Sequence, residues 1–181
     1  VEPNHLYENG LQRRKFLPAI ELLNAHTLVH NLEGGLDYRL RALESAEIYH
    51  YPLDDAAEIG LQVAFRSISP DEGRVAVVLP IEGRDIHTRR CGDGVAWFEF
   101  TALCDGPRSQ NDYIELARLF QTVLIGNVPK FSVKREDQAR RFISLVDEFY
   151  DRSVKLIISA ESPILDLYQG QRLAFEFQRT E

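Results

Sequence analysis

TVLIGNVPKFSVKREDQARRFISLVDEFYDRSVKLIISA, residues 122–160, decides the fold class because it reads as strand, helix and strand in turn. Its two ends, 122–129 and 154–160, are near-continuous apolar runs, which are typical of buried strands. Between them, residues 136–151 repeat apolar side chains at helical spacing, namely Ala139, Phe142, Ile143, Val146, Phe149 and Tyr150. A strand, a long helix and a second strand predict a βαβ unit with parallel pairing, and therefore an α/β protein.

Short segments of strand-like composition stand upstream of this unit. They are RVAVVLP (74–80), RDIHTRR (84–90) and VAWFEF (95–100). Glu82-Gly83 separates the first two, and Gly92-Asp93-Gly94 separates the last two. Short runs divided by glycine-containing turns predict an antiparallel β-meander. Between this meander and the βαβ unit, Ser109 followed three residues later by Asp112 predicts a helix that begins with a capping box.

The amino-terminal part of the chain predicts further elements. Residues 11–24 fit an amphipathic helix with a break or restart at Pro18, and 26–32 read as a strand. Asp37 predicts the start of a short helix that runs to Ile48. Another helix is expected after Asp54 or Asp55, because apolar residues follow at helical spacing, namely Ala57, Leu61, Ala64, Phe65 and Ile68.

Two more elements are expected near the carboxyl end. Ser162-Pro163 predicts a short helix to Tyr168, and LAFEF (173–177) reads as a final strand.

Composition bounds the functions that this chain can have. Its 181 residues suit one ordinary domain or two small ones. The net charge of −7 argues against non-specific binding to nucleic acid, which needs a basic face. Apolar runs are far shorter than the roughly 20 residues that cross a bilayer, and two cysteines without a C-x-x-C favour a reducing compartment. We therefore expect a soluble, cytoplasmic protein with no transmembrane segment. The absence of methionine and the start at Val1 suit a fragment.

Motifs for nucleotide or metal binding are missing from the sequence. It contains neither G-x-x-x-x-G-K-[ST] nor G-x-G-x-x-G, and its five histidines show no metal-ligand spacing. Asp147-Glu148 within the predicted helix and Arg89-Arg90 at a hairpin end are interpreted as solvated side chains. Cys104 is interpreted as a buried free thiol.

Two pairs of arginines are the candidate binding residues. Arg13 and Arg14 stand near a helix start, where the helix dipole disfavours cations, so they either meet an external anion or acidic partner or point into water. Arg140 and Arg141 lie in the first half of the predicted helix 136–151. One of them either reaches a ligand at the sheet edge or extends over the core with its charged end in water. Arg108 is left without a predicted role.

Long segments of the chain, taken in order, resemble one known family. They are LYENGLQRRKFLPAIELL (6–23), DYRLR (37–41), LCDGPRSQNDYIELARLFQTVLIGNVP (103–129), ARRFISLVDEFYDRSVKLIISAE (139–161) and LYQGQRLAFEFQRT (167–180). Together these segments are similar to the family of the bacterial cell-division ATPase ZapE and the mitochondrial AFG-type ATPases. The likeness covers nearly the whole chain and is weakest over 44–100.

This resemblance implies a partial P-loop NTPase core of the AAA type with an inserted β-meander and a C-terminal βαβ-containing region. Residues 1–33 would finish the ATPase core and carry the arginine-finger segment, 34–102 would be the helical and meander insertion, and 103–181 the C-terminal α/β region. Family members carry the Walker A and B residues upstream, so the resemblance implies a C-terminal half that is inactive alone and is not expected to bind ATP or Mg²⁺.

The resemblance also implies roles for the arginines and for the longer protein. Arg13, with Arg14 as the alternative, would be the arginine finger that completes a neighbouring subunit's ATP site, which requires a homo-oligomer. Arg140 or Arg141 would contact nucleotide like a sensor-two arginine. The full-length protein would hydrolyse ATP with Mg²⁺ to remodel a division-ring partner of the FtsZ type, with a peripheral position at the inner membrane or division site. A non-catalytic interaction module with structural arginines is the alternative.

Overall fold

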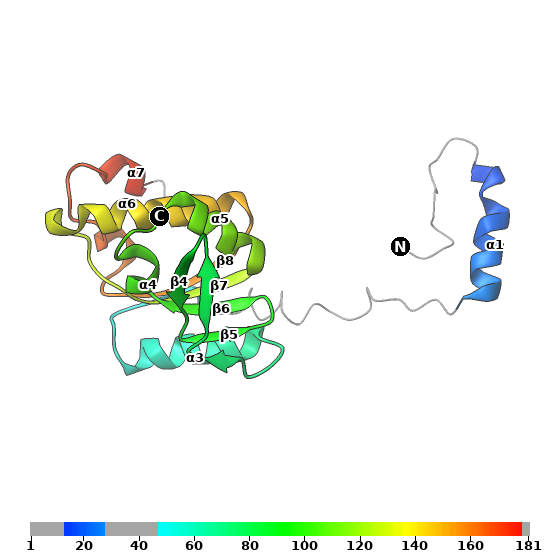
Figure 1. Cartoon of the computed structure of the whole chain (residues 1–181), viewed down its shortest axis with the longest axis horizontal. Coiled ribbons are helices and arrows are strands. Elements are labelled where there is room, and N and C mark those ends of the chain that lie inside the picture. Colours follow the sequence, from blue (N-terminus) through cyan, green and yellow to red (C-terminus); the bar gives the residue numbers. More distant parts are fainter. Residues whose placement is uncertain (1–12, 28–46, 179–181) are drawn as a thin grey trace. The chain divides into compact units, whose positions relative to one another are not determined.

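The computed structural model describes residues 13–27 and 47–178, and the chain divides into two units, Val1–Arg41 and Ala42–Glu181. In the first unit, the 3₁₀ turn η2 (Arg13–Lys15) leads into helix α1 (Leu17–His26) (Figure 1). Pro18 stands in the first turn of α1, where its missing N–H breaks no helical hydrogen bond. Pro18 therefore begins the helix and does not interrupt it.

Two predicted elements fall mainly outside the described residues. Of the predicted strand 26–32, His26 ends α1 and Thr27 caps it with a backbone bond to the Leu23 carbonyl (2.9 Å), and the rest is not described. The predicted helix from Asp37 to Ile48 lies outside the described residues as far as residue 46, and its last two residues, Glu47 and Ile48, are not helical.

The second unit is a three-layer α/β sandwich around a six-stranded sheet of order β1-β8-β7-β6-β5-β2. The strands are β1 (Tyr49–His50), β2 (Arg74–Val75), β5 (Arg90–Gly92), β6 (Val95–Glu99), β7 (Thr122–Val128) and β8 (Lys155–Ala160). The four strands from β1 to β6 in this order are parallel, while β5 and β2 are antiparallel to their neighbours. The α/β fold class and the parallel βαβ unit are confirmed.

Helices cover both faces of this sheet (Figure 1). One face carries α4 (Phe100–Cys104), α5 (Gln110–Leu119) and α6 (Glu136–Asp151), and the other carries α3 (Asp55–Ile68). Short turns η3 (Val133–Arg135) and η4 (Ile164–Asp166) and the helix α7 (Ala174–Gln178) complete the unit. Asp54 is the N-cap of α3, where its carboxylate accepts a bond from the Ala57 N–H (2.9 Å), as predicted from its position.

The predicted meander is one long hairpin followed by a strand of the parallel sheet. Strands β3 (Val78–Ile81) and β4 (Arg84–His87) pair in a separate two-stranded sheet. Backbone bonds from Ala76 to Arg89 and from Thr88 to Val77 join this pair to β2 and β5, so residues 74–92 form a continuous ladder. The turn residues Glu82 and Gly83 both have positive φ (48° and 72°), as in a type I′ turn. The six-stranded sheet takes β1, β2, β5 and β6 from residues 34–102, and it takes β7 and β8 from residues 103–181.

Two apolar clusters hold the layers together. Leu61 and Phe65 of α3 pack on Trp97, Leu124 and Ile157 on one sheet face. On the other face, aromatic rings gather around Phe131, whose ring centre lies 5.4–5.7 Å from those of Phe100, Phe142 and Phe177. Each such fully buried side chain stabilises the fold by about 1.5–3 kcal/mol.

The predicted final strand at 173–177 is wrong, because residues 174–177 belong to helix α7 and Leu173 lies in the turn before it. Leu173 and Phe177 are buried while Phe175 is 81% exposed. Residues i and i+4 share a face in a helix as well as in a strand, so the apolar residues at 173 and 177 fit both structures. Phe175, between them, distinguishes the two structures, because residue i+2 shares the face of residue i in a strand but not in a helix.

Candidate functional site

Arg13 and Arg14 lie in the turn η2, directly before α1. The Arg13 carbonyl accepts a bond from the Phe16 N–H (2.8 Å), which closes the turn. Arg13 is half-buried, and Arg14 and Lys15 are exposed. Neither η2 nor the first turn of α1 contains an acidic residue. Three consecutive cationic side chains at a helix start make this turn locally basic in a chain of net charge −7.

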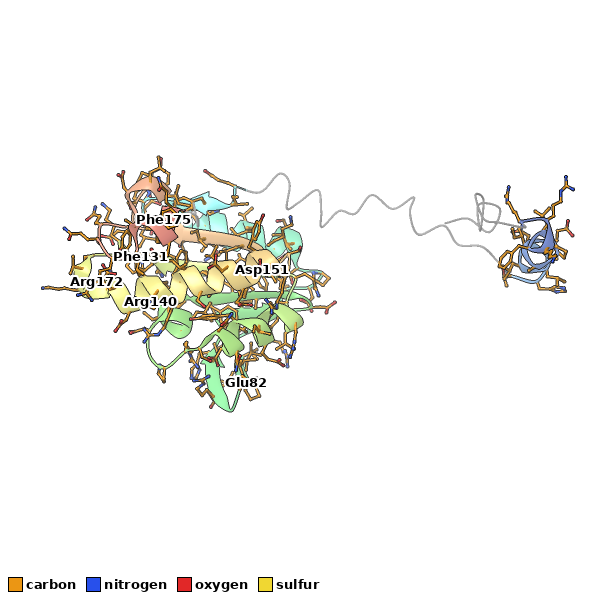
Figure 2. All side chains as sticks on the ribbon, turned by 90° about the horizontal axis from the view of Figure 1, so that it is seen from above. Glu82, Phe131, Arg140, Asp151, Arg172 and Phe175 are labelled. Atoms are coloured by element: carbon orange, nitrogen blue, oxygen red, sulfur yellow. The ribbon has the colours of Figure 1, made fainter. Side chains whose placement is uncertain are left out.

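Arg140 and Arg141 are neighbours on α6 with different surroundings. Arg140 is exposed near the amino end of the helix (Figure 2). Arg141 is half-buried, and its Nη1 donates to the Cys104 carbonyl at the end of α4 (3.3 Å). The structure therefore gives Arg141 a bond that holds α4 to α6. These two arginines belong to the second unit, and Arg13 and Arg14 to the first.

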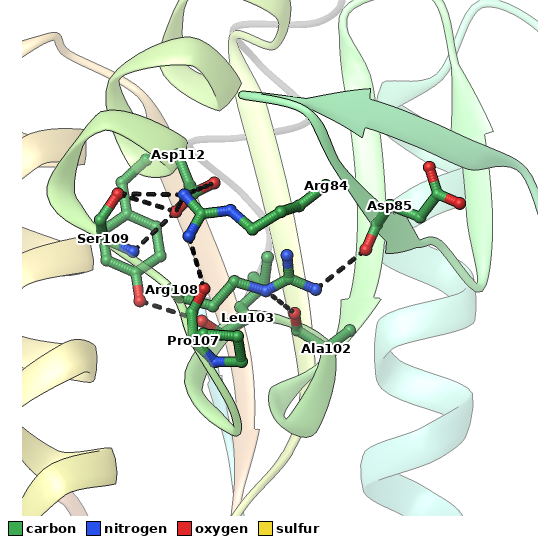
Figure 3. Close-up of polar contacts among 9 residues, drawn as sticks. Arg84, Asp85, Ala102, Leu103, Pro107, Arg108, Ser109 and Asp112 are labelled. Atoms are coloured by element: carbon green, nitrogen blue, oxygen red, sulfur yellow. Dashed lines mark hydrogen bonds and ion pairs between the residues drawn. The ribbon is translucent and has the colours of Figure 1, made fainter.

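Arg108, which had no predicted role, joins the meander hairpin to α4 (Figure 3). Its Nε donates to the Ala102 carbonyl and its Nη2 to the Asp85 carbonyl, both at 3.0 Å. Both acceptors are backbone groups. Arg108 is therefore a brace between β4 and α4.

Beside this brace lies an ion pair that the sequence reading missed (Figure 3). The Nη2 of Arg84 lies 2.8 and 2.7 Å from the two carboxylate oxygens of Asp112, whose side chain is fully buried. Its Nη1 donates to the Pro107 carbonyl (2.8 Å). The Ser109 N–H also donates to Asp112 (2.6 Å), which completes the predicted capping box of α5. Asp112 thus caps α5 and anchors the hairpin.

A second polar group lies where the parallel strands β6 and β7 end. The Nη1 of Arg89 donates to Glu58 on α3 (2.8 Å) and lies 3.2 Å from a carboxylate oxygen of Glu99. Its guanidinium carbon lies 4.2 Å from the centre of the Trp97 ring, a cation–π contact. The Asn127 side chain donates to Glu99 (2.8 Å). We call these five residues the carboxyl-edge cluster.

The backbone of β7 presents Asn127 to this cluster. Asn127 has a φ of 63°, and the pairing of β7 with β8 shifts between Ile125 and Val128. Asparagine tolerates this left-handed conformation better than most residues, and its N–H bonds to the Ser159 hydroxyl (3.0 Å). Ligands often bind at this edge of an α/β sheet. With two carboxylates on one guanidinium, however, the cluster suits attachment of α3 to β6 better than phosphate binding. The expectation of a solvated Arg89 is wrong.

The carboxyl-edge cluster has a definite pH dependence. The bond from Arg89 lowers the pKa of Glu58, with Gln62 and the charge of Arg89 acting in the same direction against burial. A lowered pKa in the folded state stabilises the protein above the unfolded pKa, and this contribution is lost as the pH falls through the folded pKa. We expect Glu58→Gln to reduce the free energy of unfolding by about 1 kcal/mol at neutral pH.

This difference between parent and Glu58→Gln should disappear in acid, when urea unfolding is repeated below the folded pKa. Glu115→Gln is the matched control, because Glu115 pairs with Arg118, which is 70% exposed. A stability difference for Glu58→Gln that stays constant with pH would contradict the ion-pair assignment.

Both cysteines are buried free thiols. Burial raises the pKa of both the Cys91 and the Cys104 thiol, so neither is an activated nucleophile. In residues 13–27 and 47–178, no three His, Cys, Asp or Glu side chains are grouped to hold a metal ion. Within the same ranges, no helix has the length and apolar character needed to cross a membrane.

Comparison with known proteins gives a consistent result. The model of the AFG1-like ATPase family matches residues 1–181. The chain is 44% identical over 179 residues to the cell division protein ZapE of Escherichia coli K12, a match that covers 99% of this chain and 48% of that protein. It is 36% identical over 173 residues to lactation elevated protein 1 homolog B of Danio rerio, covering 93% and 34%. The chain thus spans about half the length of ZapE. No solved structure matches.

Proposed function

The chain belongs to the AFG1-like ATPase family, and from this membership we propose that the longer protein hydrolyses ATP with Mg²⁺. The family match over residues 1–181 carries the proposal, and it bears out the resemblance seen in the sequence. Because ZapE is about twice as long as this chain, we assign the triphosphate and Mg²⁺ to the other half of the longer protein. No residue described here is assigned to the metal.

We assign the arginine finger to Arg13, with Arg14 as the alternative. The basic turn η2 and the positive end of the α1 dipole would both favour an anion at this position. A planar guanidinium that reaches a neighbouring subunit's γ-phosphate offsets the charge that develops during phosphoryl transfer. Such a finger acts between subunits, so the active form is proposed to be a homo-oligomer.

The proposed substrate of this ATPase is a division-ring protein of the FtsZ type. Support comes from the name of the E. coli relative, a cell division protein. The hydrolysis cycle would remodel this partner at the cytoplasmic face of the inner membrane, where the protein would be peripheral. The net charge of −7 speaks against nucleic acid as the partner.

The experiment that tests this function is phosphate release from Mg²⁺-ATP by the full-length protein. We expect turnover by the full-length protein and none by residues 1–181 alone. A full-length protein that neither binds nor hydrolyses ATP would overturn the proposal. It would favour the non-catalytic interaction module, for which the internal bonds of Arg84, Arg89, Arg108 and Arg141 are the supporting observation.

Arg140 and Arg141 are proposed as the sensor-two-like pair in the full-length protein. Loss of a hydrogen bond to a charged phosphate costs about 1.5–3 kcal/mol, so alanine at the contacting position should weaken nucleotide binding by about tenfold or more. Equilibrium binding of a fluorescent ATP analogue measures this. Arg66→Ala, at an exposed arginine of α3, is the control.

Arg140→Ala is the cleaner variant, because Arg141→Ala also removes the bond to the Cys104 carbonyl. If both variants bind and hydrolyse ATP like the parent, these side chains only cover the core, and the sensor assignment falls.

A further inference from the structure

A short sequence pattern occurs twice in this chain, once in each unit. It reads LYENGLQRRKF at 6–16 and LYQGQRLAF at 167–175. Leu, Tyr, Gly, Gln, Arg and Phe recur in the same order, and the second copy is one residue shorter on each side of the glycine. In both copies the arginine stands three residues before the phenylalanine. The pattern therefore aligns Arg172 with Arg13, the residue proposed above as the arginine finger.

The structure shows how the second copy of the pattern is held in place. Residues 167–173, which we call the arginine turn, follow β8 and η4 and lead into α7. Leu167 is fully buried. The Tyr168 hydroxyl donates to the Glu136 carboxylate at the start of α6 (2.9 Å) and accepts from the Leu173 N–H (2.8 Å). The tyrosine thus ties both α6 and the far end of the arginine turn to one point.

The arginine turn also requires its glycine. A Cβ atom on Gly170 would lie 2.3 Å from Oε1 of Glu136 and 2.4 Å from the hydroxyl oxygen of Tyr168. Both distances are far shorter than an ordinary contact between carbon and oxygen atoms. A buried leucine, a bridging tyrosine and a glycine at a close approach therefore explain the first three shared residues as parts that build the arginine turn.

The other three shared residues are not needed to hold the arginine turn. Gln171, Arg172 and Phe175 are exposed, and Figure 2 shows Arg172 at the amino end of α6. Exposed side chains add little to packing, so the fold does not explain why they recur. Arginine and aromatic side chains are enriched where proteins contact other molecules. The recurrence of these exposed residues therefore indicates a shared contact with another molecule.

Arg172 can reach an external anion. Among the residues that the structure describes, no hydrogen bond or ion pair engages its guanidinium. It lines an open hollow whose other charged residues are Lys134, Glu136 and Asp137. Two cations and two carboxylates balance there, so this hollow is not an anion site of its own. An arginine finger, however, acts on a site in a neighbouring subunit, and it needs an exposed end on a fixed base, which the arginine turn provides.

We propose that Arg172 is a second phosphate-contacting arginine, carried by the second unit as Arg13 is carried by the first. Its guanidinium bonds the triphosphate that a neighbouring subunit holds, because paired planar donors match phosphate oxygens. No covalent bond forms or breaks at Arg172, which only offsets negative charge during phosphoryl transfer. This inference rests on the proposed ATPase function and adds to it a residue from the second unit.

The test is Arg172→Ala in the full-length protein, with phosphate release and equilibrium ATP binding measured on the same preparation. We expect turnover at saturating ATP to fall by about 100-fold or more, as when one donor to a transition-state charge is removed, while ATP binding stays unchanged. Arg66→Ala, at an exposed arginine of α3, is the matched control and should keep the parent's turnover.

Arg172 is exposed, so its replacement should leave the fold intact. Arg172→Ala is expected to keep the circular dichroism and unfolding midpoint of residues 1–181. It should also keep the sedimentation of the full-length oligomer with ATP. These measurements separate a loss of turnover from a loss of folding or assembly.

Three results would overturn the inference. If Arg13→Ala loses turnover and Arg172→Ala does not, Arg172 contacts no phosphate, while the ATPase function stands. If Arg172→Ala breaks up the oligomer, its side chain is a contact between subunits and not a ligand of phosphate. A full-length parent that does not hydrolyse ATP overturns the proposed function and this inference together.

Discussion

Alanine in place of Arg13 is expected to lower ATP turnover by the full-length, assembled protein by about 10³- to 10⁵-fold. The reason is that the guanidinium would act on the charge of the transition state at a neighbouring subunit's site, where few other groups can replace it. ATP binding should stay largely unchanged, since the triphosphate is proposed to be held by the other half of the protein. Phosphate release and equilibrium ATP binding, measured on the same preparation, check both parts.

Arg14→Ala is the matched variant, because Arg14 is in the same turn and is more exposed than Arg13. A large loss of turnover with Arg14→Ala alone would transfer the finger to Arg14. If neither variant changes turnover in an oligomer that the parent also forms, no finger lies in this turn.

Alanine in place of Arg84 is expected to lower the free energy of unfolding by about 3 kcal/mol. The substitution leaves the fully buried carboxylate of Asp112 without its counter-charge, and breaking a buried ion pair from one side costs about 3–5 kcal/mol. The lower end applies because the Arg84 side chain is itself 36% exposed and because the Ser109 N–H and hydroxyl still donate to Asp112. Denaturant unfolding of residues 1–181 gives the value.

Arg118→Ala is the comparison for this prediction, because Arg118 forms an exposed pair with Glu115, and such pairs contribute about 0–1 kcal/mol. If Arg84→Ala and Arg118→Ala have equal, small effects, Arg84 does not anchor the hairpin. Asp112→Asn should also destabilise the chain, since it removes the charge that Arg84 meets.

Elements whose signal is local were predictable from the sequence. The stripe from Ala139 to Phe149 predicted α6, and the apolar runs on either side predicted β7 and β8. Ser109 and Asp112 predicted the start of α5, because a capping box is formed by residues that are close in the sequence.

Features that depend on distant residues were not predictable in this way. Strand β1 is only two residues long, too short to show periodicity. Arg84 and Asp112 are 28 positions apart, and neither carries a pattern that names the other. The position of Arg89 at a hairpin end predicts a solvated side chain, yet Arg89 bonds to Glu58, 31 positions away. Such pairs become visible only when the sheet brings α3, the hairpin and α5 together.

The placement of β1 has a consequence for the order in which this fold assembles. Strands β6, β7 and β8 are consecutive in the chain and adjacent in the sheet, whereas Tyr49 pairs with Ile158, about a hundred residues later. Because distant contacts cost more entropy to close, we expect β1 to be the last strand of the parallel set to join the sheet during folding.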